Sequence, residues 1–129
     1  MTVGSWDPNS QNKSIPIEAL VFALSLSDEH SFPTEPPEQL VSLQPFVKTG
    51  QATWQGIFTD FDSAQLKQLC VFFTLAEKHW SDWFGGDKNP VIWICKELKS
   101  RGDFPDKDLT MWIKQNSDNR FLPYGNVLG

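Results

Sequence analysis

Cysteine and histidine are scarce in this chain of 129 residues, which contains two of each. A structural zinc site needs several such side chains at short spacings, and the four present (Cys70, Cys95, His30 and His79) are not spaced in that way. The sequence therefore predicts no metal site, and no glycine-rich motif suggests a nucleotide cofactor. Both cysteines fall in apolar helical patterns, so we expect buried free thiols in a reducing compartment. A disulfide would require their two helices to face each other at close range.

Excess positive charge and long hydrophobic runs are also missing. The chain has 11 Lys and Arg against 16 Asp and Glu, a net charge of −5, whereas binding to nucleic acid or to anionic membranes needs a basic surface. The longest apolar stretches, 69–76 and 91–95, are far shorter than the ~20 residues of a membrane span. Residues 1–14 lack the apolar core of a signal peptide. We therefore expect a soluble cytoplasmic protein that binds neither nucleic acid nor membrane.

A recognisable catalytic motif is absent as well. Cys70 and His79 stand nine residues apart on one predicted helix, about 13.5 Å along its axis, so they cannot form a nucleophile–base pair. The sequence thus predicts no catalytic residue and favours a non-enzyme. An enzyme that uses His79 with Asp82 or Asp87 as acid and base is kept as an alternative.

Aromatic residues, in contrast, are abundant. The chain has 10 Phe and 6 Trp, and 40% of its residues are hydrophobic, which is enough to build the core of one domain. Apolar residues recur at helical spacing, and no alternating strand pattern occurs. We predict an all-α fold, a small bundle of about five helices. The predicted organisation is a flexible N-terminal tail over 1–13 and one helical domain over 14–129, which includes an extended C-terminal segment over 117–129.

Caps, prolines and glycines punctuate the predicted helices. Asp62 is a good N-cap, and Gln65 three residues later completes a capping box for the longest helix. This helix is apolar over most of its surface, as expected of the central helix of a small domain. Pro45 must kink or end an earlier helix. The predicted helices cover about 15–28, 34–45, 62–84, 90–101 and 106–116, and a short piece around Phe46 and Val47 stops near Gly50.

The first candidate site lies where the longest helix ends and the next begins. Residues 79–89 combine His79, Trp83, Asp87 and Asn89. A helix N-terminus beside aromatic walls can bind a small anion or a polar head group. The alternative is purely structural, because Trp83 would continue the core stripe and Asn89 would cap the next helix.

The second candidate site is the C-terminal segment, in which Arg120, Phe121 and Tyr124 surround a proline. Its apolar residues either pack on the bundle and close its open end, or meet a partner or a second copy of the chain. Because aromatic residues are enriched at interfaces, a protein-interaction or adaptor module is the favoured function. A small-molecule-binding domain with its pocket near 79–89 is the alternative, followed by the enzyme that uses His79.

Overall fold

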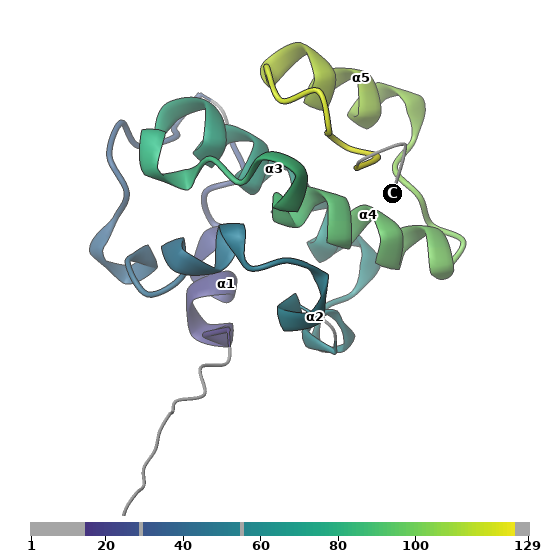
Figure 1. The fold of residues 1–129 in the computed structure, drawn as a ribbon, viewed down its shortest axis with the longest axis horizontal. Helices are drawn as coiled ribbons and strands as arrows, with labels where there is room; N and C mark the ends of the chain where they lie inside the picture. Colours follow the sequence, from purple (N-terminus) through teal and green to yellow (C-terminus); the bar gives the residue numbers. More distant parts are fainter. Residues whose placement is uncertain (1–14, 29, 55, 126–129) are drawn as a thin grey trace, which may run out of the picture.

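The computed structural model describes residues 15–28, 30–54 and 56–125, and all regular structure within them is helical (Figure 1). The all-α class and the small bundle are confirmed, and the predicted tail over 1–13 lies outside the described residues. No helix in this part of the chain is both long and apolar enough to cross a membrane. The α-helices are α1 (Ile17–Leu24), α2 (Gln51–Trp54), α3 (Ser63–His79), α4 (Pro90–Ser100) and α5 (Lys107–Asn116).

Helix α3 is the centre of the bundle and contacts α1, α4 and α5. It begins as predicted, because the Asp62 side chain accepts a hydrogen bond from the Gln65 amide at 2.7 Å and the Gln65 side chain accepts one from the Asp62 amide at 2.9 Å. This reciprocal box satisfies two amides at the helix start. Side chains on several faces of α3 are buried, so the helix is surrounded by protein on most sides, which agrees with its apolar pattern.

The end of α3 differs from the prediction. The helix stops at His79, and Trp80 adopts an extended conformation (φ −120°, ψ 108°) before the short 3₁₀ turn η4 (Ser81–Trp83). Both indoles are nevertheless buried, with Phe72 meeting Trp80 and Trp83 edge-on at 6.0 and 5.8 Å. The change of direction turns the two tryptophans onto the same phenylalanine, a packing gain that overrides helix continuation.

The region between α1 and α3 is built from short pieces, and the predicted helix that begins near residue 34 is represented there by 3₁₀ turns. Its turns are η1 (Glu38–Leu40), η2 (Gln44–Lys48) and η3 (Ile57–Asp60), with the four-residue helix α2 between the last two. Prolines remove backbone donors along this stretch, which prevents a longer helix. Large buried side chains attach the pieces to the core instead, and Trp54, which is fully buried, donates from Nε1 to the Phe46 carbonyl at 3.0 Å.

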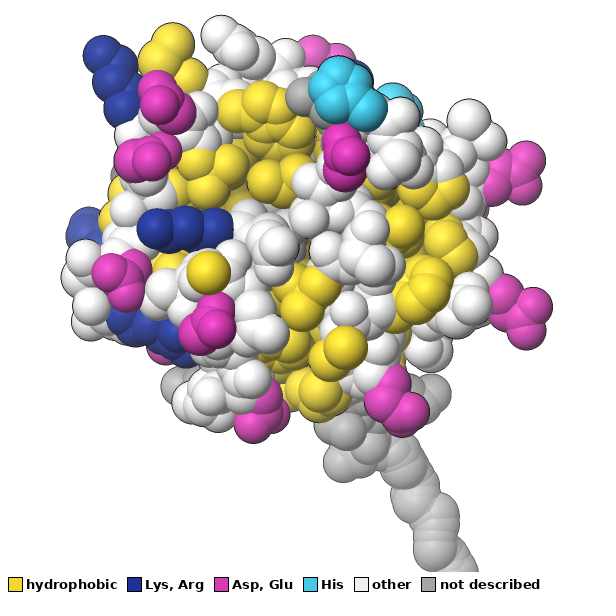
Figure 2. Space-filling model, turned by 180° about the vertical axis from the view of Figure 1, so that it is seen from behind, with side chains coloured by type: hydrophobic (Ala, Val, Ile, Leu, Met, Phe, Trp, Pro, Cys, Tyr) yellow, Lys and Arg dark blue, Asp and Glu magenta, His cyan; other side chains and the backbone are white. Residues whose placement is uncertain are grey.

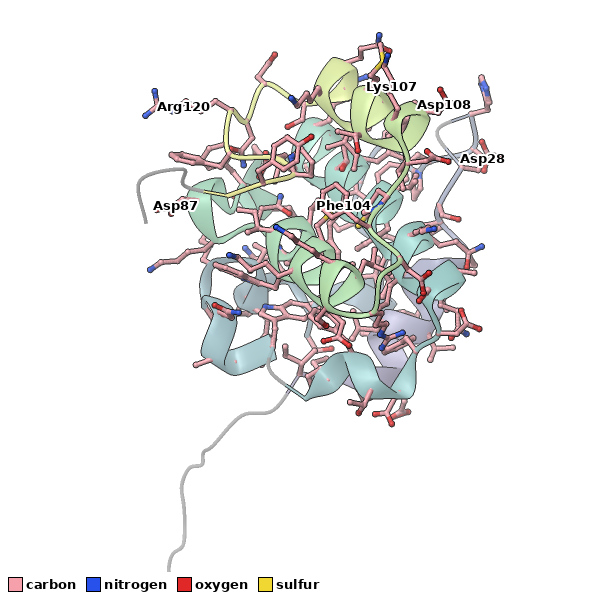
Figure 3. The ribbon with its side chains drawn as sticks, turned by 90° about the vertical axis from the view of Figure 1, so that its right-hand side faces the viewer. Asp28, Asp87, Phe104, Lys107, Asp108 and Arg120 are labelled. Carbon is pink, nitrogen blue, oxygen red and sulfur yellow. The ribbon has the colours of Figure 1, made fainter. Side chains whose placement is uncertain are left out.

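Helices α4 and α5 follow their predicted caps. The Asn89 side chain accepts from the Val91 amide at 2.8 Å, and the Asp106 side chain accepts from the Leu109 amide at 2.9 Å. After α5 the chain turns and runs back between α5 and α4 (Figures 1 and 3). Leu122 is buried there, so the described part of the C-terminal segment packs on its own domain.

Candidate functional site

Glu77, near the end of α3, joins the α3–α4 loop to the C-terminal segment. Its Oε1 atom accepts hydrogen bonds from the Gly85 amide at 3.0 Å, from Asn89 Nδ2 at 2.8 Å and from Asn119 Nδ2 at 3.2 Å. Asn119 also donates to the Gly86 carbonyl at 2.9 Å. The two regions that the sequence singled out separately are therefore held together by one carboxylate.

Glycine is required where this loop approaches the rest of the bundle. A Cβ atom on Gly85 would lie 2.4 Å from the Val47 carbonyl oxygen and 2.8 Å from the Cα of Asn89. Both neighbours are backbone atoms, which cannot move aside as a flexible side chain can. Gly85 thus lets the loop pack against η2 and brings its amide within reach of Glu77.

One cavity, here called the α4 cavity, opens between α4 and the C-terminal segment. Its volume is about 530 Å³. Figure 3 shows Phe104 between α4 and α5, at the centre of this face. The Tyr124 ring stacks on Phe104 with centroids 5.9 Å apart, and the Lys114 ammonium lies 4.9 Å from the Tyr124 centroid. The lining residues are Ile92, Cys95, Lys96, Lys99, Phe104, Pro123 and Tyr124.

The α4 cavity is apolar inside and cationic at its edge. Lys96 and Lys99 are both exposed, and the described lining contains no carboxylate. On the face seen in Figure 2, the Lys and Arg side chains lie mainly toward the edge that carries α4 and α5, and Asp and Glu side chains lie both among them and at the opposite edge. Lys96 and Lys99 thus place two positive charges at the edge of this cavity in a protein whose net charge is −5.

A second cavity, here called the Phe84 cavity, lies between the end of α3, the α3–α4 loop and residues 115–121, with a volume of about 500 Å³. Phe84 is 55% exposed at its edge. The lining carries charges of both signs, with Glu77 and Asp118 opposed by Lys78 and Arg120. Its polarity makes it a weaker candidate than the α4 cavity for an apolar ligand.

The residues predicted in the first candidate site are dispersed. His79 is exposed, with its ring 5.5 Å from that of Phe32. Trp83 belongs to the core, and the buried Asn89 caps α4, so both have the roles of the structural alternative. Asp87 is exposed and lines a separate cavity of about 390 Å³. No cavity described here is lined by all four residues, and ligand binding by them stays a prediction.

The residues predicted in the C-terminal segment do line cavities. Arg120 and Phe121 contribute to the Phe84 cavity, where the Arg120 guanidinium lies 5.2 Å from the Phe121 centroid. Tyr124, 52% exposed, forms one wall of the α4 cavity. The sequence did not indicate Glu77 or Phe104: a glutamate on a helix and a phenylalanine in a loop carry no signal until their three-dimensional neighbours are known.

The two cysteines face each other across α3 and α4. Their Sγ atoms are 3.9 Å apart, both residues are buried, and both are free thiols. The close-range geometry that a bridge would require is therefore present, although no bridge is formed. The hydrogen-bonding contact with Cys95, together with burial, raises the pKa of Cys70 well above its ordinary value, so Cys70 keeps its proton at neutral pH. Cys95 alone of the two lines the α4 cavity.

A metal site and a histidine–carboxylate pair each require suitable side chains to lie close together. Among the described residues, no group of three or more His, Cys, Asp or Glu side chains could hold a metal ion. None of the hydrogen bonds or ion pairs observed there joins His79 to Asp82 or Asp87.

Comparisons of the chain with protein-family models, with curated proteins and with solved structures find no match.

Proposed function

We propose that this chain is a non-catalytic protein-interaction module of the cytoplasm, which binds a short apolar and acidic segment of a partner protein in the α4 cavity. The observation that carries the proposal is the combination in that cavity of apolar walls with Lys96 and Lys99, without a carboxylate among the described lining residues. An apolar side chain of the partner would fill the cavity, and adjacent Asp or Glu side chains would meet the two ammonium groups.

Tyr124 is the main anchor of the proposed surface. It presents a large, half-exposed ring that is held in place by stacking on Phe104 and by the Lys114 ammonium. A rigid aromatic ring with a hydroxyl at its end contributes contact area at little cost in conformational entropy, which is why tyrosine is common at interaction hot spots.

An acidic partner fits this surface better than a second copy of the chain does. A symmetric dimer formed through the α4 cavity would place the patch against itself, and Lys96 and Lys99 would then face the same lysines of the other copy. Juxtaposed like charges oppose association. The two free buried thiols are in keeping with a reducing compartment.

A small amphiphilic carboxylate is a second candidate for the same cavity. Its volume of about 530 Å³ lies within the range of about 300–1,000 Å³ that small-molecule sites occupy. The same two lysines would bind its carboxylate. Competition between such a molecule and a bound peptide would show that both use one site.

The proposal is tested by selecting peptides from a random display library on the full-length protein. Affinities of the enriched peptides are then measured by fluorescence anisotropy on the wild type, on Tyr124→Ala and on Lys96→Ala. Met111→Ala is the matched control, because Met111 is 46% exposed on α5 and lines neither the α4 cavity nor the Phe84 cavity. Circular dichroism confirms that each variant is folded.

We expect peptides that combine an aromatic or aliphatic residue with Asp or Glu, and binding that weakens as salt is added. Tyr124→Ala should weaken binding at least about tenfold, the effect of losing a hot-spot side chain, while Met111→Ala leaves it unchanged. If no peptide is enriched, or if enriched peptides bind Tyr124→Ala as tightly as the wild type, the proposal is wrong.

A further inference from the structure

Cys70 and Cys95 form a buried dithiol between the two most closely associated helices of the bundle. Their sulfur atoms, 3.9 Å apart, would have to approach by about 1.9 Å to reach the bond length of a disulfide. A movement of this size is within the reach of side-chain rotation and a small shift between helices. The pair is thus close enough to be joined without unfolding the chain.

Of the two thiols, Cys95 is the one that lines a cavity described here. Cys95 lines the α4 cavity, whose volume of about 530 Å³ exceeds many times the ~30 Å³ share of a water molecule. A molecule as small as hydrogen peroxide can therefore approach Cys95 from this side. Cys70, which is fully buried, lines none of the cavities described above.

The protonation state of Cys70 agrees with oxidation that begins at Cys95. Because burial and the contact with Cys95 raise the pKa of Cys70, Cys70 stays a thiol while it contacts the other sulfur. Such a thiol is a poor first target for an oxidant, since the thiolate is the reactive form. Its position, not its protonation state, suits it to react second, because its sulfur lies 3.9 Å from the Cys95 sulfur and can attack that sulfur once it has become electrophilic.

We propose that Cys70 and Cys95 constitute a peroxide-sensitive site, in which Cys95 is oxidised first through the α4 cavity and Cys70 then closes a disulfide between α3 and α4. In the first step the Cys95 sulfur attacks a peroxide oxygen, the O–O bond breaks, and the departing oxygen leaves as water with the thiol proton. This forms a sulfenic acid on Cys95.

In the second step the Cys70 sulfur attacks the sulfenic sulfur. The S–S bond forms, the S–O bond breaks, and the hydroxyl leaves as water with the Cys70 proton. In total the two thiols lose two electrons and two protons to one peroxide molecule, which yields two water molecules. The disulfide is reversed by a dithiol reductant through thiol–disulfide exchange. This proposal does not rest on the proposed peptide binding, and the test uses the protein without a peptide.

The test is peroxide treatment of the native full-length chain, followed by alkylation of the remaining thiols and non-reducing tryptic mass mapping. Cleavage after the lysines at 67, 78, 88 and 96 places Cys70 in peptide 68–78 and Cys95 in peptide 89–96. We expect these two peptides to appear linked, with both of them from one molecule and without disulfide-linked dimers. N-acetylcysteine in a parallel reaction confirms that the peroxide is active.

Two variants test the order of the steps. In Cys70→Ala, Cys95 should accumulate as a sulfenic acid that a dimedone probe traps. In Cys95→Ala, Cys70 should be oxidised at least about tenfold more slowly than Cys95 is in Cys70→Ala, because Cys70 lines none of the cavities described above. The proposal is overturned if the thiols of the native protein do not react, or if they are linked only between molecules or only in denaturant. It is also overturned if a sulfenic acid forms on wild-type Cys95 but never proceeds to the disulfide. The wild-type mapping decides the matter even if a variant fails to fold.

Discussion

Replacing Glu77 by alanine tests the junction between the α3–α4 loop and the C-terminal segment. The substitution removes the acceptor shared by the Gly85 amide, Asn89 Nδ2 and Asn119 Nδ2. Asn119 keeps its bond to the Gly86 carbonyl, whereas the described bonds of the buried Asn89 amide nitrogen are limited to the one with Glu77. The variant therefore leaves a buried donor without a partner.

The expected loss of stability follows from these contacts. A buried donor left unsatisfied costs about 1–3 kcal/mol, and each lost hydrogen bond to a charged acceptor contributes on a similar scale. Because Glu77 is only partly buried, water replaces some of the lost bonds, and we expect a total of about 2–4 kcal/mol. For a chain of 129 residues this corresponds to a decrease in Tm of about 7–15 °C.

Urea unfolding followed by tryptophan fluorescence measures this loss, with two matched variants. Glu77→Gln retains a carbonyl oxygen in the place of the acceptor and should lose less than about 1 kcal/mol. Glu35→Ala removes an exposed carboxylate that makes none of these bonds and should change stability by less than about 0.5 kcal/mol. The reasoning is refuted if Glu77→Ala is as stable as Glu35→Ala, or if glutamine is as harmful as alanine.

Three further substitutions test other parts of the structure, each by the same unfolding assay. Gly85→Ala places a Cβ 2.4 Å from a backbone oxygen and should cost about 1–3 kcal/mol through overpacking; a wild-type value would show that η2 and the loop separate freely. Arg101→Lys keeps the charge but removes the planar guanidinium group that donates to the Phe58 and Phe61 carbonyls at 2.8 and 3.0 Å. We expect the variant to lose about 1–2 kcal/mol of stability, and a variant as stable as the wild type would contradict this. The raised pKa of Cys70 predicts that the free energy of unfolding falls as the pH rises above about 9, because the thiol then ionises in the unfolded chain but not in the folded one. The expected slope is at most about 1.4 kcal/mol per pH unit. Cys70→Ala should flatten that slope, and a slope unchanged by the substitution would contradict the assigned origin.

The parts of the fold that the sequence predicted well are those fixed by local chemistry. Asp62 with Gln65, and Asn89 before a proline, are capping signals that act within a few residues. They located the starts of α3 and α4 correctly. The C-terminal end of α3 could not be predicted in this way. It depends on the packing of Trp80 and Trp83, which lie beyond the helix, against the Phe72 ring within it.

The candidate site also combines residues that a local sequence pattern indicates with residues that it does not. Tyr124 was selected from the sequence because an aromatic residue in a proline-containing segment suggests a contact surface, and it does line the α4 cavity. Glu77 could not have been selected, since its three partners lie 8, 12 and 42 residues away. Such a role arises where segments distant in the sequence meet in the fold, and no local sequence pattern predicts it.

The short helical pieces between α1 and α3 have a consequence for the motions of the bundle. Pieces of three to five residues are far below the ~12–15 residues at which a helix has marginal stability by itself. They persist because Leu40, Leu43 and Trp54 are inserted into the core. Once one anchor leaves, its neighbours lose their support, so this layer should exchange its amide hydrogens as one unit and faster than α3 does. The rapidly opening side of the molecule is thus the side that supplies some of its most deeply buried residues.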